Sequence, residues 1–248
     1  MTWGNPVRAY SGGFDAFAAK LSAYGSLTWY TFLGGAGTDF GQAIAVDGSG
    51  NVYVGGRSNA TWRGVNDPMR AYSGDYDAFA AKLSAEDGSL TWNTFLGGTG
   101  SDFGHAIAVD GSGNVYVGGS GNVTWGVPKR ALSGSYDAFA AKLSANDGSL
   151  TWNTFLGGTG SDSGQAIAVD GSGNIYVGGY SNLTWGNPVR AYSGDYDAFA
   201  AKLSADGSLT WNTFLGGTGE DSGQAIAVDG SENVYVGGVQ PQYMAGGE

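Results

Sequence analysis

The sequence predicts an all-β fold, a β-propeller built from four-stranded antiparallel blades. One stretch, residues 41–56, returns three times in nearly the same form, beginning at Gly104, Gly164 and Gly223. The 248-residue chain also holds 47 Gly and only 5 Pro, together with many aromatic side chains. Repeats rich in tight-turn residues and short apolar runs are typical of propellers and related repeat architectures.

Each repeat has room for four strands. The first two lie at 43–47 and 51–55. They are joined by the turn Asp-Gly-Ser-Gly-Asn at 47–51, whose residues tolerate the positive φ of a hairpin turn. The third and fourth, 77–83 and 90–96, alternate with a period of two residues. Both faces of these strands carry apolar side chains, which is expected when each sheet lies between two neighbouring sheets.

The third strand is the place where a helix is the alternative, because Ala, Lys and Leu are good helix formers. This segment reads Asp-Ala-Phe-Ala-Ala-Lys-Leu, and its copies begin about every 60 residues, at Asp15, Asp77, Asp137 and Asp197. We favour a strand, because the segment is short for a helix and lies in a repeat of strands.

The two ends of the chain carry complementary parts of one repeat. Strands near 14–34 supply the third and fourth strands, and strands near 224–238 supply the first and second. We therefore expect residues 1–248 to form a single propeller domain of four repeats, whose ends share one blade and close a four-bladed ring. Closure within one chain favours a monomer, and the alternative is a homodimer that exchanges ends into an eight-bladed ring.

These residues carry a family resemblance. The run TFLGGTGSDSGQAIAVDGSGNIYVGG, followed by a loop with Pro and then DAFAAKL, resembles the bacterial SBBP repeat, which is named for a seven-bladed β-propeller. The resemblance covers nearly the whole chain and implies a propeller in an extracellular or cell-surface protein, without implying an activity. The chain departs from the family's name in blade count, since it holds four repeats.

Composition limits the partners. The formal net charge of −11 makes nucleic acid and anionic membrane surfaces unfavourable ligands. The chain has no Cys, so it can form neither disulfides nor thiolate metal sites. No stretch has the pattern of a signal peptide or of a membrane-spanning segment, so we expect no membrane insertion.

The candidate site lies on the end of the propeller that carries the long loops. Strand direction places the loops between second and third strands, and those between repeats, on this same end. Aromatic, guanidinium and carboxylate groups recur in these loops and suit a glycan, another polar ligand or a protein partner. The repeated side chains are Trp3, Trp62, Trp125 and Trp185, Arg8, Arg70, Arg130 and Arg190, and Asp39, Asp102, Asp162 and Asp221.

A structural interpretation competes with the binding one for all twelve residues. Trp can pack over the end of a blade, Arg can pair with loop groups, and Asp can cap a Gly-rich turn. A repeat copies structural residues and site residues alike, so repetition does not distinguish the two interpretations.

Catalytic signals are weak. The chain's one His, His105, stands where the other repeats have Gln42, Gln165 and Gln224, so no shared catalytic or metal-binding His exists. We expect no cofactor, although Asp oxygens near the axis could hold a cation such as calcium. The favoured function is a non-catalytic binding module, and carbohydrate is one ligand that the long-loop end could bind. The alternatives are a structural or surface-display protein, and a lyase or hydrolase on a propeller scaffold.

Overall fold

The computed structural model describes residues 4–62 and 67–240. This part of the chain is all-β, as predicted, and contains sixteen strands and no α-helix. Accordingly, none of the described residues forms a helix able to cross a membrane. The strands are β1 (Ala16–Leu21), β2 (Leu27–Leu33), β3 (Asp39–Val46), β4 (Val52–Ser58), β5 (Asp77–Leu83), β6 (Leu90–Leu96), β7 (Asp102–Val109), β8 (Val115–Gly121), β9 (Asp137–Leu143), β10 (Leu150–Leu156), β11 (Asp162–Val169), β12 (Ile175–Ser181), β13 (Asp197–Leu203), β14 (Leu209–Leu215), β15 (Ser222–Val228) and β16 (Val234–Val239).

Three complete blades form the middle of the molecule. They are the antiparallel sheets β3-β4-β5-β6, β7-β8-β9-β10 and β11-β12-β13-β14, each following the order of the chain. The segment DAFAAKL is strand β5, β9 or β13 in these sheets, so the helical alternative is wrong. It pairs on both sides, which satisfies its backbone groups within the sheet.

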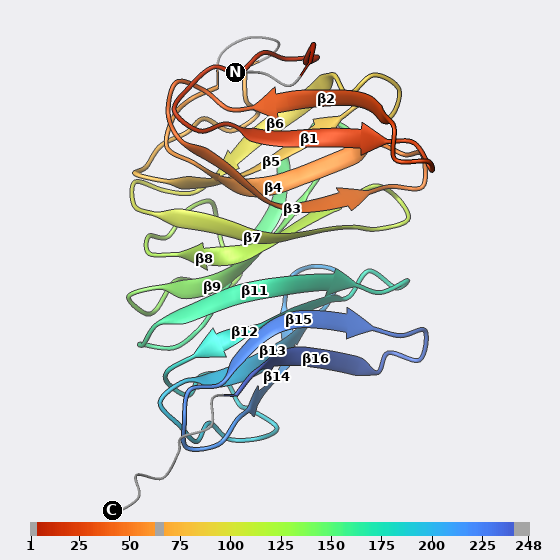
Figure 1. Cartoon of the computed structure of the whole chain (residues 1–248). Coiled ribbons are helices and arrows are strands. Elements are labelled where there is room, and N and C mark those ends of the chain that lie inside the picture. The colour runs from red at the N-terminus through yellow and green to blue at the C-terminus, as the bar shows by residue number, and fades with distance from the viewer. Residues whose placement is uncertain (1–3, 63–66, 241–248) are drawn as a thin grey trace, which may run out of the picture.

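The shared closing blade is not formed in this structure. β1 and β2 make one two-stranded sheet, and β15 and β16 make another. Figure 1 shows the sheets stacked one after the other, with these two incomplete sheets at opposite ends of the stack. The described residues therefore form an open series of blades, and the predicted four-bladed ring closure is absent from it.

The predicted hairpin turn owes its shape to an aspartate. Asp47 Oδ1 accepts hydrogen bonds from the backbone amides of Ser49 and Asn51, both at 2.9 Å, and Gly50 takes a φ of 82°. The Tyr53 hydroxyl donates to Asp47 Oδ2 at 3.0 Å, which ties the turn to the second strand. The same bonds recur in the next two repeats around Asp110 and Asp170.

The core lies between neighbouring sheets. Ile107 of β7 packs against Gly55 of the preceding sheet, where a side chain at Gly55 would come within 3.3 Å of the isoleucine Cβ. Phe79, Tyr116 and Phe139 are fully buried. Each apolar cluster combines side chains from two adjacent sheets, which explains why both faces of the strands are apolar.

The long loops gather on one end of the blades, as strand direction predicts. Asn59, in the loop after β4, accepts a hydrogen bond through Oδ1 from the amide of Thr38, in the loop before β3, at 2.6 Å. At the other end, the β3–β4 turn approaches the β5–β6 turn, where a side chain at Gly50 would meet Ala85. The long loops therefore lie at one end of each blade and the tight turns at the other, as predicted.

Candidate functional site

The recurring tryptophans lie beneath the long-loop end, inside the protein. Trp62 Nε1 donates to Asp39 Oδ1 at 2.7 Å, and the indole packs edge-on against Phe79 with 4.7 Å between ring centroids. Trp125 and Trp185 hold the equivalent places in the next two blades and are also buried. Trp3 lies outside the described residues. These three indoles support the blade ends and do not present a ring to solvent.

The recurring aspartates shape the loops between repeats. Each lies at or just before the first strand of a sheet, is buried, and accepts a hydrogen bond through Oδ2 from a backbone amide four residues earlier. The bonds are Gly35 to Asp39 at 2.9 Å, Gly98 to Asp102 at 2.9 Å, Gly158 to Asp162 at 2.9 Å and Gly217 to Asp221 at 2.8 Å.

The recurring arginines tie the long loop to the end of the fourth strand. Arg130 donates to Phe155 O at 3.2 Å and Gly157 O at 2.5 Å, and its guanidinium lies 5.7 Å from the Trp185 ring centroid. Arg8, Arg70 and Arg190 make corresponding bonds to the carbonyls of Phe32, Phe95 and Phe214. The structure thus brings Trp, Arg and Asp together, in contacts that fit the structural interpretation of these side chains.

Burial of these carboxylates makes stability depend on pH. Removal from water raises the pKa of Asp102 to about 7, an effect that the Gly98 amide partly offsets and the neighbouring Asp77 reinforces. The folded protein therefore binds a proton at Asp102 more tightly than the unfolded chain does. The contribution of Asp102 to stability is retained at low pH and is lost as pH rises from about 4 to 7, at most by about 1.4 kcal/mol per pH unit.

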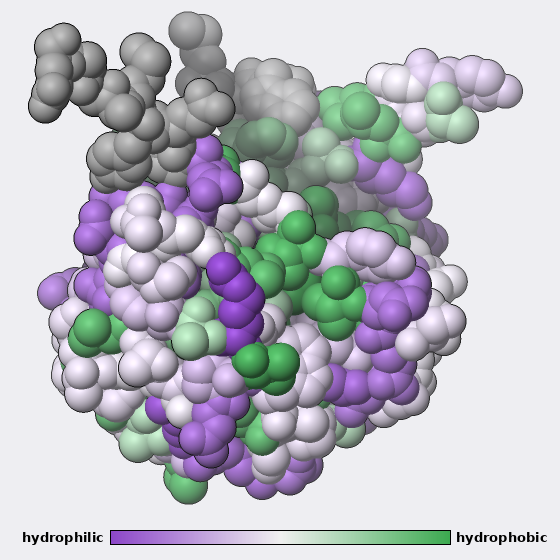
Figure 2. All heavy atoms as spheres, turned by 90° about the horizontal axis from the view of Figure 1, so that it is seen from below, coloured by the Kyte–Doolittle hydropathy of each residue, from purple (hydrophilic) through white to green (hydrophobic). Residues whose placement is uncertain are grey.

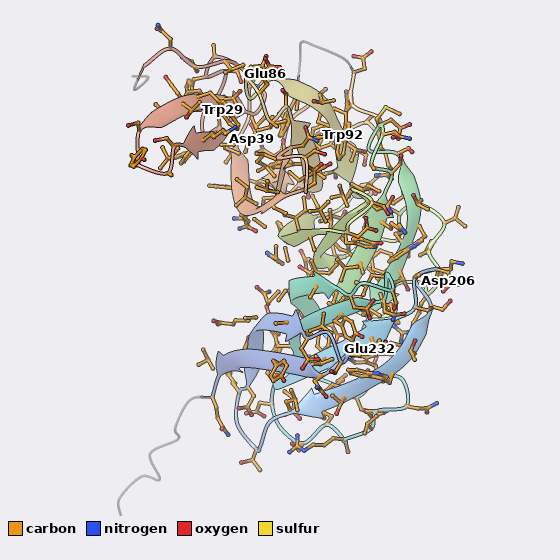
Figure 3. All side chains as sticks on the ribbon, turned by 90° about the vertical axis from the view of Figure 1, so that its right-hand side faces the viewer. Trp29, Asp39, Glu86, Trp92, Asp206 and Glu232 are labelled. Carbon is orange, nitrogen blue, oxygen red and sulfur yellow. The ribbon has the colours of Figure 1, made fainter. Side chains whose placement is uncertain are left out.

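We expect Asp102→Asn to reduce this loss of stability. An asparagine keeps an oxygen that can accept from Gly98 and carries no charge to desolvate. Urea unfolding between pH 4.5 and pH 7.5 measures the effect, and Glu86→Gln, at an exposed carboxylate labelled in Figure 3, is the control. A pH dependence equal in Asp102→Asn and the parent would contradict the assignment.

A second set of side chains lies where the first strands of successive sheets meet, on the same long-loop end. Here the otherwise similar repeats differ. The position after the glycine pair of the second strand holds Arg57, Ser120, Tyr180 or Val239, and the position facing it on the first strand holds Phe40, Phe103, Ser163 or Ser222. Residues that vary in this way are not required by the fold common to all repeats.

Two of the grooves at these positions, which lie between neighbouring sheets, are called here the inner-rim grooves. The first, about 380 Å³, is lined by Tyr180, Tyr196, Glu220 and Gln224, among others. Its two tyrosine rings meet edge-on with centroids 5.6 Å apart. The second, about 300 Å³, has Tyr180 on its wall and adds the other ring-bearing and polar side chains Phe103, His105, Tyr136 and Gln165.

The corresponding place between the first two complete blades is occupied by an arginine. The guanidinium of Arg57 lies 4.8 Å from the Phe40 ring centroid and 5.3 Å from that of Phe103. Replacement of this arginine by Ser120 or Tyr180 in later repeats leaves space for a ligand. The boundaries between blades therefore have the same backbone and different surfaces.

His105 contributes a neutral polar group to the second groove. Its Nδ1 lies 3.0 Å from Gln42 Oε1, and its Nε2 lies 3.4 Å from Ser120 Oγ. Burial, with a smaller effect of Arg57, lowers the pKa of His105 to about 4, so the ring is uncharged at neutral pH. Neither neighbour is a carboxylate that could orient the imidazole for catalysis. In the described part of the chain, no three His, Asp or Glu side chains are grouped as metal ligands.

Sequence reasoning missed the tyrosines of these grooves. Tyr196 has an aromatic counterpart in every repeat, so it resembles a structural residue, whereas Tyr180 occurs once. The sequence did carry one signal for these grooves, since the repeats have different residues at the position held by Arg57 and Tyr180. This difference becomes informative once the strand register shows that the position lies at the rim between sheets.

Comparison with known proteins agrees with this architecture. A family model described as the SBBP β-propeller repeat matches residues 28–61, 91–124 and 151–183. The chain is also 31% identical to a protein called regulatory protein FlaEY from Caulobacter vibrioides, in an alignment that covers 90% of this chain and 26% of that protein. It thus spans about a quarter of the length of this relative. Each match runs from the fourth strand of one sheet (β2, β6 or β10) through the first two strands of the next, and the chain therefore contains three SBBP-type β-propeller repeats.

Proposed function

We propose that this chain is a non-catalytic interaction module that binds carbohydrate in its inner-rim grooves. The observation that carries the proposal is the first groove, where Tyr180, Tyr196, Glu220 and Gln224 converge on a space of about 380 Å³. It lies on the long-loop end, at positions that vary between repeats. Binding sites are commonly carried by such positions on a rigid scaffold.

The chemistry of the groove suits a saccharide. A tyrosine ring offers an apolar face for the C–H groups of a sugar, and its hydroxyl offers a polar edge. The carboxylate of Glu220 accepts hydrogen bonds from sugar hydroxyls, and the amide of Gln224 both donates and accepts. The net charge of −11 favours such an uncharged polar ligand over an anionic one.

Three further points support binding without catalysis. The two hydrogen-bonding neighbours of the neutral His105, Gln42 and Ser120, are not carboxylates, and the recurring aspartates are engaged in loop hydrogen bonds. The relative from Caulobacter vibrioides is called a regulatory protein, a name that suits action through binding. An extracellular or cell-surface location, which the family resemblance implies, also suits a glycan ligand.

The competing proposal is a structural or surface-display protein. The near identity of the complete blades favours it, because their sequences repeat the same packing residues at every boundary. Both proposals are compatible with a structure in which the incomplete sheets are completed, because pairing covers their open strand edges. Ligand binding that depends on a groove residue distinguishes the two.

The test uses residues that the protein already places at equivalent positions. Tyr180→Ser with Glu220→Ser gives the first groove the serines found as Ser120 and Ser161 in the preceding repeat. We expect affinity for an immobilised glycan array to fall by about five- to tenfold, since loss of one good aromatic contact costs about 1–1.5 kcal/mol. The melting temperature should change little.

Tyr24→Ser is the matched control, because Tyr24 is 97% exposed in the turn after β1, on the other end of the blades. It should bind the array as the parent does. A parent protein that is retained by no glycan, or a double variant that binds as well as the parent, would contradict the carbohydrate proposal.

A further inference from the structure

We propose that two copies of this chain join through their incomplete end sheets into one closed ring. In each junction, β16 of one copy pairs with β1 of the other, so that the order β15-β16-β1-β2 forms a complete blade. A second copy of the chain is thus the occupant of both open edges. The inference is independent of the proposed ligand.

Strand pairing defines the junction. In the complete blades, the second and third strands pair in one constant register, with Val54 opposite Ala81, Val117 opposite Ala141 and Val177 opposite Ala201. Among the described residues, β16 pairs only with β15 and β1 only with β2. The same register would place Val236 of one copy opposite Ala19 of the other.

An isoleucine and a glycine provide a second, independent match. At each formed boundary an isoleucine of the first strand packs on a glycine of the preceding sheet. These pairs are Ile107 on Gly55, Ile167 on Gly118 and Ile226 on Gly178. The fourth isoleucine, Ile44, is 58% exposed, and a side chain added at the fourth glycine, Gly237, would meet only Ala225 at 3.8 Å.

A tryptophan and a turn glycine provide a third match. Trp29 covers Gly88 of the following sheet so closely that a Cβ there would lie 2.5 Å from the ring, and Figure 3 labels Trp29 with its counterpart Trp92. Trp92 covers Gly148 and Trp152 covers Gly207 in the same way. The remaining pair is Trp211 and Gly25, and a Cβ at Gly25 would have nothing within 4 Å.

All three matches require the same arrangement. Pairing β16 with β1 of a second copy brings the Ile44 of that copy toward Gly237, and its Gly25 toward Trp211. Apolar side chains that are buried in complete blades are exposed at these edges: Tyr235 and Leu21 are each 58% exposed, whereas Tyr53 and Leu83 are fully buried. Figure 2 views the end of the molecule that carries β16, where apolar side chains gather near the middle of the face and polar ones surround them.

The positions of the two edges favour a second copy over closure within the chain. The incomplete sheets lie at opposite ends of the stack in Figure 1, and the blades follow an arc in Figure 3. When two different surfaces of one protein bind each other, the copies form either an open filament or a closed ring. Two arcs related by a two-fold axis can complete both end sheets of both copies, which leaves neither β1 nor β16 as an open edge.

Cysteine pairing tests which edges meet, because the chain has no Cys of its own. A chain with Val236→Cys is mixed with a chain carrying Ala19→Cys and oxidised. We expect a covalent dimer from the mixture, and much less from either variant alone, because opposite residues in an antiparallel pair have Cβ atoms about 4.5–5.5 Å apart. The chain with both substitutions distinguishes the alternative, since closure within one copy would give an internally linked monomer.

Light scattering tests the assembly without a cross-link. The parent should show twice the 25.3 kDa chain mass, and Gly237→Leu, which fills the place proposed for Ile44, should show a single chain mass. Gly111→Leu is the matched control, because a Cβ at Gly111 meets nothing within 4 Å, and it should remain a dimer. A monomeric parent, an internally linked double variant, or a series of larger oligomers would overturn the two-copy ring.

Discussion

Truncation of Trp185 to alanine is expected to lower the free energy of unfolding by about 3–5 kcal/mol, the range typical of a buried Trp replaced by Ala. Trp185 is only 4% exposed and packs edge-on against Phe199 and Phe214, with centroids 5.3 and 6.0 Å away. The guanidinium of Arg130 from the preceding repeat lies over it. Removal of the indole leaves a cavity between two blades. Urea denaturation measures the loss.

Val189→Ala, an exposed apolar truncation in the same long loop, should change stability by no more than about 0.5 kcal/mol. At a temperature where Trp185→Ala is folded, its retention on glycans should equal that of the parent, because the indole does not line the inner-rim grooves. An unchanged unfolding curve combined with weaker glycan binding would instead place Trp185 in the binding site and contradict the packing role.

The local structure of this protein could be predicted from its sequence because short-range chemistry determines it. The Asp47 turn uses a carboxylate, an asparagine and a residue with positive φ, which is glycine in three copies and Glu232, with a φ of 64°, in the fourth, and the pattern is visible in the repeat. The strand nature of DAFAAKL followed from its surroundings, since β5 pairs with strands on both sides. In this case sheet pairing overrides the helix propensity of Ala, Lys and Leu.

Ring closure could not be predicted in the same way. Complementary strands at the two ends show which edges match, but the rotation from one sheet to the next decides whether they meet within one chain. That rotation depends on contacts such as Ile107 on Gly55 and Trp92 on Gly148. Such contacts join residues that are about 50 or more positions apart, and sequence patterns do not report their geometry.

The inner-rim grooves lie on the end of the blades where the sequence places the candidate site, and their lining combines two of the predicted residues, Asp162 and Asp221, with side chains that were not predicted. Repetition drew attention to Trp, Arg and Asp, and in this structure repetition reflects a packing need at every blade boundary. The inner-rim grooves depend on departures from the repeat, such as Tyr180 in place of Ser120. Those departures have meaning only after the register shows that they face the same rim.

The second large effect is expected from a single methyl group at Gly179. Its position on β12 faces the bulged part of β11, and an added Cβ would collide with the backbone carbonyl of Ser163. A backbone oxygen held in a sheet cannot move aside as a flexible side chain can. Gly179→Ala should therefore force the two strands apart and lower the free energy of unfolding by about 3 kcal/mol or more.

Gly171→Ala makes the same chemical change in the turn that joins β11 to β12, where a Cβ would meet nothing within 4 Å. It should leave stability unchanged or raise it by up to about 1 kcal/mol, because alanine reduces the freedom of the unfolded chain. Chemical denaturation of both variants, with hydrogen exchange of the β12 amides, measures the difference. Equal stability of the two variants would mean that β11 and β12 lie further apart at Gly179 than this register requires. The close pairing of the first and second strands in each blade would then be wrong.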